Sequence, residues 1–294
     1  MILFDESMKF YKGNTHTHTS VSDGSLPPEA VCDIYQAQGY DFIVQTDHWK
    51  VSPERMHKGM LVMQGTEFDV YPPSQTAHIV GVGVTPEVLN KGFSKQSEAQ
   101  PIIDAINEDG GCAILAHPTW SMNTPQFMMS LHGLTAAEIY NTFSSAPWNA
   151  DRGDASALLD VSATNGWVQP LVAADDSHRY TGEAGRSYIM VQAEACESRA
   201  IVNAMKTGRF YASQGPRFHY VEVLEDRMII RCSPASRIIF YSDLPWVGGR
   251  CRSGVGLQEA EYIFQRERGE TFVRCEIIDA FGARAWLSPV KIEY

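Results

Sequence analysis

The feature that most constrains the fold of this sequence is a recurring unit of an apolar strand, polar residues at its end, and a helix. Strands are predicted over residues 40–48, 112–118 and 170–178, and each ends in histidine or aspartate, as in "QTDH", "LAHP" and "ADDSH". Helices are predicted over residues 27–39, 99–111 and 154–166. Parallel α/β barrels collect their active-site residues on the loops after the strands, so this order predicts a barrel-like α/β domain.

The pattern changes at about Pro216. Short alternating strands follow, separated by turn residues: "HYVEVLE", "RMIIRC", "RIIFYS", "AEYIFQR", "TFVRCEIIDA" and "ARAWLSPVKIEY". They predict a small antiparallel β-sandwich. We therefore expect two domains, a barrel over residues 1–215 and a β-sandwich over residues 216–294.

Polar residues near the predicted strand ends are of the types that bind metal ions. His16 and His18 are two residues apart, so on an extended chain both imidazoles face the same side. Six of the nine histidines belong to this set, whereas scattered core histidines would not sort in this way. The candidate ligands are His16, His18, Asp23, His48, Glu67, His78, His117, Asp176 and His178.

Each of these residues also has an ordinary structural interpretation. "TDH" is compatible with a helix cap, the segment around Glu67 with a solvated strand end, and "LAHP" with a buried histidine bonded to backbone. Taken together, the set favours metal binding. Imidazole and carboxylate without thiolate suit zinc, manganese or iron. Nine donors exceed the needs of one catalytic ion, so we expect two or three divalent ions sharing a bridging carboxylate.

The ordered motifs "HTHTSVSDG", "QTDH", "GTE", "HIVGVG", "LAHP" and "ADDSH" resemble those of the PHP (polymerase and histidinol phosphatase) superfamily. The resemblance spans about residues 10–213 and implies a metal-dependent hydrolase on a distorted (β/α)7 barrel. "AEIYNT" and "GRFYASQGP", followed by β-strands, resemble the branch that includes carbaryl hydrolases. Hydrolysis of carbamates, carboxyl esters or amides is therefore an alternative to hydrolysis of phosphoesters.

The resemblance also implies how the ligands are grouped. His16, His18, Glu67 and Asp176 would hold one ion, and Glu67 would bridge to a second ion held by His78 and His117. Asp23, His48 and His178 would form a third site. Many relatives have a histidine at the position of Asp23, so the third ion is expected to bind more weakly here or to be missing.

Metal ions of this kind activate water and polarise the bond that is cleaved, which makes Glu67 essential as the bridge. If the third site is empty, His178 or His48 is free to protonate the leaving oxygen. Arg179 and Arg186 are candidate contacts for an anionic substrate, because the guanidinium fork fits phosphate or carboxylate. A non-catalytic metal-binding module is the remaining alternative.

Composition and charge narrow the range of partners. The 294 residues carry a formal net charge of -11, which disfavours long nucleic acid and leaves a small, anionic substrate as the expected partner. No apolar run approaches the ~18 residues of a membrane span. The apolar N-terminal start is followed by acids and lacks a basic region and a cleavage site, so we expect a cytoplasmic protein that does not bind membranes. The sequence carries no signal for an oligomeric state.

Overall fold

The structure is a computed structural model that describes residues 1–293. Its α-helices are α1 (Pro28–Ala37), α2 (Ala99–Glu108), α3 (Pro125–Met129), α4 (Ser156–Thr164) and α5 (Ser198–Lys206), and its 3-10 helices are η1 (Pro86–Lys91) and η2 (Arg266–Arg268). Strands before α5 are β1 (Ile2–Phe4), β2 (Phe10–Asn14), β3 (Phe42–Gln45), β4 (Arg55–His57), β5 (Met60–Val70), β6 (Ala77–Val82), β7 (Cys112–Leu115), β8 (Ala136–Asn141), β9 (Leu171–Ala174) and β10 (Tyr188–Gln192). Strands after α5 are β11 (Phe210–Ser213), β12 (Phe218–Val223), β13 (Arg227–Ser242), β14 (Cys251–Ile263), β15 (Phe272–Ile278), β16 (Arg284–Trp286) and β17 (Val290–Lys291).

The predicted helices and strands of the first 215 residues are present. Pro28 at the start of α1 has its φ preset for a helix and has no N–H to satisfy. The chain leaves this helix through Gly39, whose φ of 71° is a left-handed conformation that glycine adopts without strain. α1, α2 and α4 and the buried strands β3, β7 and β9 occupy the predicted ranges. The local sequence patterns were therefore sufficient for these elements.

The sheet is mixed rather than parallel throughout. β2–β3, β3–β5, β7–β8 and β8–β9 pair in parallel, whereas β6 is antiparallel to both β5 and β7, and β10 is antiparallel to β2. A parallel bridge between Thr17 and Ser177 joins the segments that follow β2 and β9. The sheet therefore curls until the ends of these two strands meet. The architecture is mixed α/β with a large sheet, and a complete (β/α)7 barrel stays a prediction.

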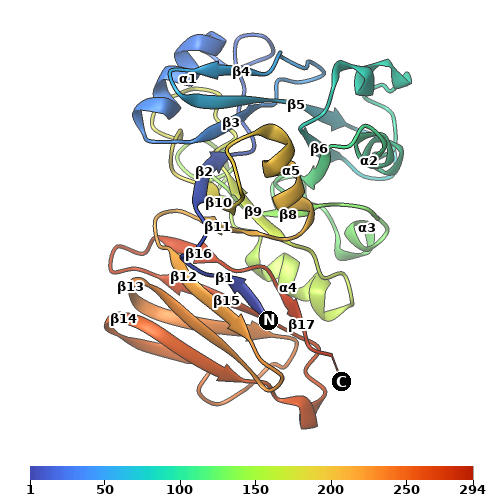
Figure 1. Cartoon of the computed structure of the whole chain (residues 1–294). Helices are drawn as coiled ribbons and strands as arrows, with labels where there is room; N and C mark the ends of the chain where they lie inside the picture. The colour runs from blue at the N-terminus through green and yellow to red at the C-terminus, as the bar shows by residue number, and fades with distance from the viewer. Residues whose placement is uncertain (294) are drawn as a thin grey trace.

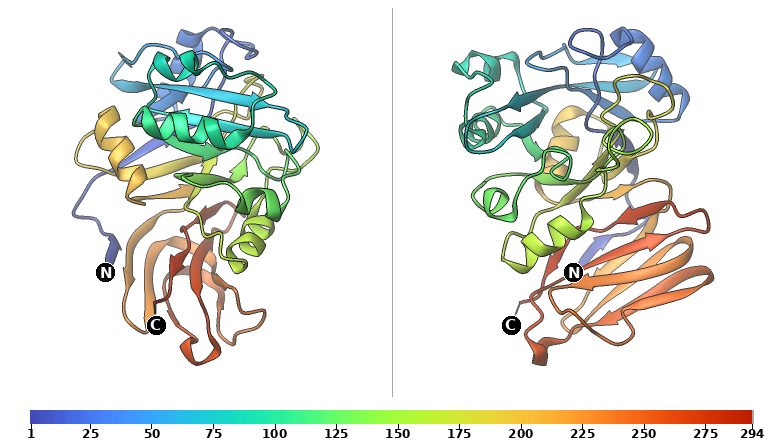
Figure 2. Two further views of the ribbon diagram at one scale, coloured as in Figure 1. Left: turned by 90° about the vertical axis from the view of Figure 1, so that its right-hand side faces the viewer. Right: turned by 180° about the vertical axis from the view of Figure 1, so that it is seen from behind.

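The strands after β11 form a separate layer below the first unit, coloured orange to red in Figures 1 and 2. Two predicted strands, "RMIIRC" and "RIIFYS", are in fact one long strand, β13. Pro234 does not end this strand, because it lies where the register with β14 shifts, and a proline is tolerated at such an irregularity. The last predicted strand is divided into β16 and β17 around Pro289. Tyr294, at the end of that predicted strand, lies outside the described residues.

The first residues of the chain belong to this lower layer. β1 pairs antiparallel with β12, with Ile2 opposite Glu222, and Figure 1 shows the blue strand among the orange ones. β11 ends at Ser213 and β12 begins at Phe218, close to the expected boundary. A division at residue 215 leaves β1 on the wrong side of its own partner strand, and the two-domain division stays a prediction.

A strand pairing and a buried ion pair are among the contacts that join the upper unit to the lower strands. β16 pairs with β11, so that Trp286 lies opposite Ala212 and is completely buried in the core around α2 and α4. On β15, Arg274 is 1% exposed and forms a forked ion pair with Asp160 of α4 at 2.6 Å for both N–O distances. The same guanidinium lies 3.3 Å from Glu276 and 4.0 Å above the ring of Tyr241.

Within residues 1–293, none of the helices combines the length and the apolar character that crossing a bilayer requires.

Candidate metal centre

His16 and His18 follow the end of β2 instead of lying within a strand. Backbone hydrogen bonds nevertheless hold this segment extended, because Asp176 N–H donates to the His16 carbonyl and His18 N–H donates to the Ser177 carbonyl, at 2.9 and 3.0 Å. Both imidazoles are fully buried, and their Nε2 atoms are 3.1 Å apart. The expected convergence of the two rings is present, although the strand expected to produce it ends at Asn14.

Glu67 on β5 and Asp176 after β9 complete a group of four donor atoms. Glu67 Oε2 lies 3.2 Å from His16 Nε2 and 3.0 Å from His18 Nε2. Asp176 Oδ1 lies 3.2 Å from each of the same two nitrogens. Five of the six donor–donor distances, 3.0–3.2 Å, match the edges of a regular tetrahedron with its centre about 1.9 Å from each corner, close to the ~2.0 Å of zinc–nitrogen and zinc–oxygen bonds. These five distances are compatible with one tetrahedral ion.

A second group shares Glu67 through its other oxygen. Glu67 Oε1 lies 2.9 Å from His78 Nδ1, on β6, and 3.4 Å from His117 Nε2, just after β7. A hydrogen bond from Ala116 N–H to the His78 carbonyl keeps these two segments together. The two oxygens of one buried carboxylate thus face two different histidine groups.

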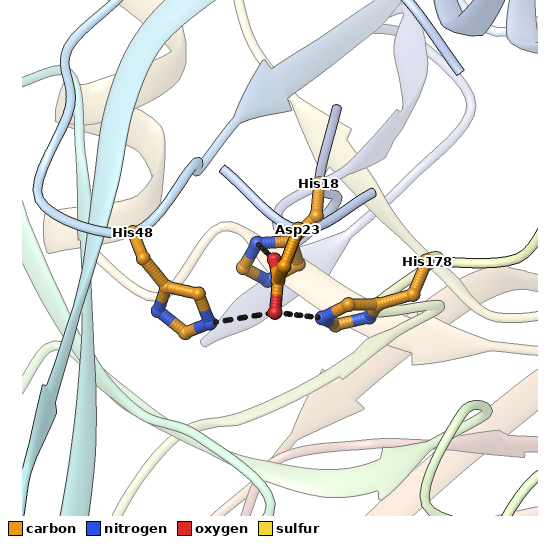
Figure 3. A group of neighbouring side chains, drawn as sticks. All are labelled: His18, Asp23, His48 and His178. Carbon is orange, nitrogen blue, oxygen red and sulfur yellow. Dashed lines mark ion pairs between the residues drawn. The ribbon is translucent and has the colours of Figure 1, made fainter. Parts of the chain in front are cut away.

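A third, more open group surrounds Asp23 (Figure 3). Asp23 Oδ1 lies 3.4 Å from His18 Nδ1, and Asp23 Oδ2 lies 3.6 Å from His48 Nε2 and 3.4 Å from His178 Nε2. The Asp23 side chain is 52% exposed, whereas that of Glu67 is 1% exposed. Gly24 allows this loop to fold back, because a Cβ there would lie 2.5 Å from the His18 carbonyl oxygen.

Charge at the centre is set by close contacts between acids and imidazoles. Burial alone would lower the pKa of His18, but Asp176 and Glu67 outweigh it and raise the pKa to about 9. The pKa of His16 is likewise raised well above its ordinary value, against the effect of burial, by Asp176, Glu67 and Glu138. Burial would raise the pKa values of Glu67 and Asp176, yet the histidines hold both well below the usual range. The site therefore favours positive charge between ionised carboxylates.

One buried nitrogen of the predicted ligands, His78 Nε2, has neither a hydrogen bond nor an ion pair among the described residues. Buried polar atoms are normally paired, so an unpaired one beside Glu67 requires an explanation. Divalent ions, which are bound by imidazole nitrogen and carboxylate oxygen, fit this donor set. All nine predicted ligands lie in three groups, which overlap at His18 and at Glu67.

Two supporting residues on β8, Glu138 and Asn141, were not predicted from the sequence. Glu138 accepts hydrogen bonds from His16 Nδ1 at 2.8 Å, from His117 N–H at 2.7 Å and from Asn141 Nδ2 at 2.8 Å. Asn141 Nδ2 also lies 3.2 Å from Asp176 Oδ2. The available signal was the acid of "AAEIYN", which stands within an otherwise apolar strand.

The acids that precede two predicted ligands hold loops. Asp47, before His48, accepts hydrogen bonds from the backbone and hydroxyl of Thr19 at 2.8 Å and from the hydroxyl of Ser22 at 2.8 Å. Asp175, before Asp176, accepts backbone N–H groups of residues 185–187, and burial raises its pKa to about 6. These carboxylates shape the loops that carry Asp23 and His178.

A cavity of about 510 Å³ opens above the centre. Besides the predicted ligands, the aromatic side chains of Tyr71, Trp120 and Phe143 and the cations Lys95 and Arg179 line it. The ammonium of Lys95 is neutralised by Asp69 at 2.7 Å. For the Arg179 guanidinium, by contrast, the described residues provide no hydrogen bond or ion pair.

Arg186, the other predicted substrate contact, lies elsewhere. Its exposed guanidinium is 5.1 Å from the centre of the Trp148 ring and bonds to the Gly182 carbonyl. It is not among the residues that line the cavity. The structure brings the predicted ligands together with Arg179 and leaves Arg186 outside.

Comparison with known proteins defines the class of the fold. The structure is similar to a two-domain protein from Bacteroides vulgatus that contains a predicted PHP-like metal-dependent phosphoesterase. The TM-score is 0.52 at 15% sequence identity, over 94% of this chain and 92% of that one. An amidohydrolase from Chromobacterium violaceum gives a TM-score of 0.45 at 15% identity, over 67% of this chain and 96% of that one. No protein-family model matches the sequence, and no curated protein matches it significantly. The likeness is one of fold, that of a two-domain PHP-like protein.

Proposed function

We propose that this chain is a metal-dependent hydrolase that cleaves phosphoesters of small molecules. The observation that carries the proposal is the position of Glu67, whose Oε2 lies 3.0 Å from His18 and whose Oε1 lies 2.9 Å from His78. A buried carboxylate between two histidine groups is suited to bridge two divalent ions, and paired ions are typical of hydrolytic phosphoryl chemistry.

The proposed ligand sets follow the three groups of donors. His16, His18, Glu67 and Asp176 would hold one ion, Glu67, His78 and His117 a second, and Asp23, His48 and His178 a third. Zinc, manganese or iron bound there would supply activated water at neutral pH and a Lewis acid for the phosphoryl oxygen.

The protein itself would hold the substrate and move a proton. The unpaired guanidinium of Arg179 lines the cavity and would bind the phosphate as a fork. If the third group holds no ion, His178 is free to act as the acid. Its Nδ1 donates to the Asp176 carbonyl at 2.8 Å, so the Nε2–H of the protonated ring is left to protonate a leaving oxygen. Its ring is held between His18 and Phe143, with centroids 4.1 and 4.5 Å away, and His48 is the alternative donor.

A carbamate, carboxyl-ester or amide hydrolase is the second candidate. The aromatic side chains of Tyr71, Trp120 and Phe143 line the cavity. Because Lys95 is paired with Asp69, Arg179 is the cation of the cavity lining without an acidic partner among the described residues. Such a cavity would also accept a neutral aromatic substrate.

Paired kinetics on Arg179→Ala separate the two candidates. With metal-loaded protein, kcat/KM for a phosphate monoester should fall about tenfold or more, and kcat/KM for a neutral aryl ester or carbamate should change much less. Faster turnover of the neutral ester in the wild type would favour the second candidate. Only trace metal after growth with zinc, manganese and iron would overturn both.

A further inference from the structure

We infer that Arg284 and Trp286, on strand β16 of the C-terminal layer, are positioning residues for the substrate cavity. The inference rests on the proposed hydrolase function. Through these two residues the C-terminal strands would take part in substrate binding, although none of the nine candidate metal ligands comes from those strands.

Trp286 crosses from the lower layer into the upper core. Its neighbours Ala285 and Leu287 pack into the core of the C-terminal strands, whereas Trp286 faces the opposite side. There its ring stacks on Tyr140 of β8, with centroids 5.8 Å apart and planes 21° apart. β8 is the strand that carries Glu138, the partner of His16 and His117.

Tyr140 in turn holds the loop of residues 142–154, which forms one wall of the cavity. The Ser145 hydroxyl donates to Tyr140 Oη at 3.1 Å, and Asn141 N–H donates to the Gly153 carbonyl at 3.0 Å. Gly153 has no room for a side chain, because a Cβ would lie 1.9 Å from Ser145 Oγ. The loop is therefore clamped at its base. Phe143 and Ser144, beside that base, and Asn149, further out, line the cavity.

Arg284 fixes the far end of the same loop. Arg284 Nη1 lies 3.3 Å from Asp154 Oδ2 and 3.3 Å from Glu276 Oε1 on β15. Asp154 also forms an antiparallel bridge with Tyr140. Arg284 and Trp286, two residues apart and therefore on the same face of β16, thus hold the end and the base of the cavity loop.

The loop carries cavity residues but none of the candidate ligands. Loosening it should weaken substrate binding while leaving the metal ions in place. Arg284→Ala should raise KM for a phosphate monoester about fivefold, with metal content unchanged and kcat little altered. Amide hydrogen exchange across residues 142–154 should become about fivefold faster. Arg284→Lys should recover part of both effects.

A second pair of variants tests the aromatic contact. Trp286→Leu removes the stack on Tyr140, and Trp286→Phe keeps a ring, so KM should rise more in the first than in the second. Arg227→Ala is the control, since this β13 arginine pairs only with exposed acids, Asp226 and Glu261, among the ion pairs of the described residues. It should change neither KM nor exchange in the loop.

Unchanged KM and unchanged exchange in folded Arg284→Ala and Trp286→Leu would overturn the inference. So would a loss of metal in Arg284→Ala, because the effect would then reach the centre itself. If the wild type hydrolyses no ester, the proposed function fails. In that case faster exchange over residues 142–154 in Arg284→Ala still supports the positioning contact, and unchanged exchange overturns it.

Discussion

The buried ion pair between Arg274 and Asp160 provides a direct test of how the two layers are held together. We consider Arg274→Met, which keeps much of the side-chain volume and removes the charge. The guanidinium is 1% exposed and bonds to both oxygens of Asp160 at 2.6 Å. Removing one partner of a buried pair leaves the other charge uncompensated, at a cost of about 3–5 kcal/mol.

Two features place the expected loss at the lower end of that range. The Asp160 side chain is 24% exposed, so water relieves part of its charge. Glu276 keeps Arg284 as a partner at 3.3 Å. We therefore expect the free energy of unfolding to fall by about 3 kcal/mol. With a urea m-value of about 3 kcal/mol per M, the midpoint should move down by about 1 M.

The assay is urea unfolding followed by circular dichroism and tryptophan fluorescence. Asp160→Asn in the Arg274→Met background should recover much of the loss, because it removes the uncompensated carboxylate. Arg227→Met, at an exposed ion pair, should leave the midpoint almost unchanged. A midpoint for Arg274→Met equal to that of wild type would refute the reasoning.

Three further outcomes concern the metal centre. Glu138→Gln should weaken metal affinity by about 10- to 100-fold with the fold retained, because the Glu138 carboxylate orients His16 and His117. Titration with zinc measures this affinity. Asp23→Ala should lower the number of bound ions without emptying the two groups that share Glu67, as read by elemental analysis; loss of every ion would contradict the separate third group. Chelation should lower the thermal midpoint, and adding zinc back should restore it, because ions that bind the folded state stabilise it. A midpoint insensitive to chelator would argue against buried ions.

Local patterns in the sequence predicted most of the elements that carry the centre. The nine candidate donors chosen near apolar strands lie together in three groups. His48, His117 and Asp176 follow strands whose ends share an edge, whereas Glu67 and His78 lie within β5 and β6. Their role as ligands stays a prediction. The spacing of His16 and His18 also predicted that their rings converge. Here the cause was different: hydrogen bonds to the segment after β9 keep the chain extended beyond the end of β2.

Features that depend on distant partners were not predictable in this way. The antiparallel direction of β6 and the pairing of β1 with β12 depend on long-range register, which alternation within one strand does not encode. No sequence motif marked Glu138 as part of the site, because its role depends on contacts with His16 and with the backbone of His117. Arg186 was predicted to contact the substrate because it is close in sequence to the "DSH" motif. In the structure its side chain lies against Trp148 and outside the cavity lining.

The pairing of β1 with β12 has a consequence for how the chain folds during synthesis. Residues 2–4 leave the ribosome well before their partner strand, which begins at Phe218. At about 5–20 residues per second, β1 waits roughly 10–40 s before its partner exists. The upper unit can bury its own core during that time, whereas the lower layer is completed later around a strand made before that unit. Removing β1 should therefore damage the layer formed by the later strands.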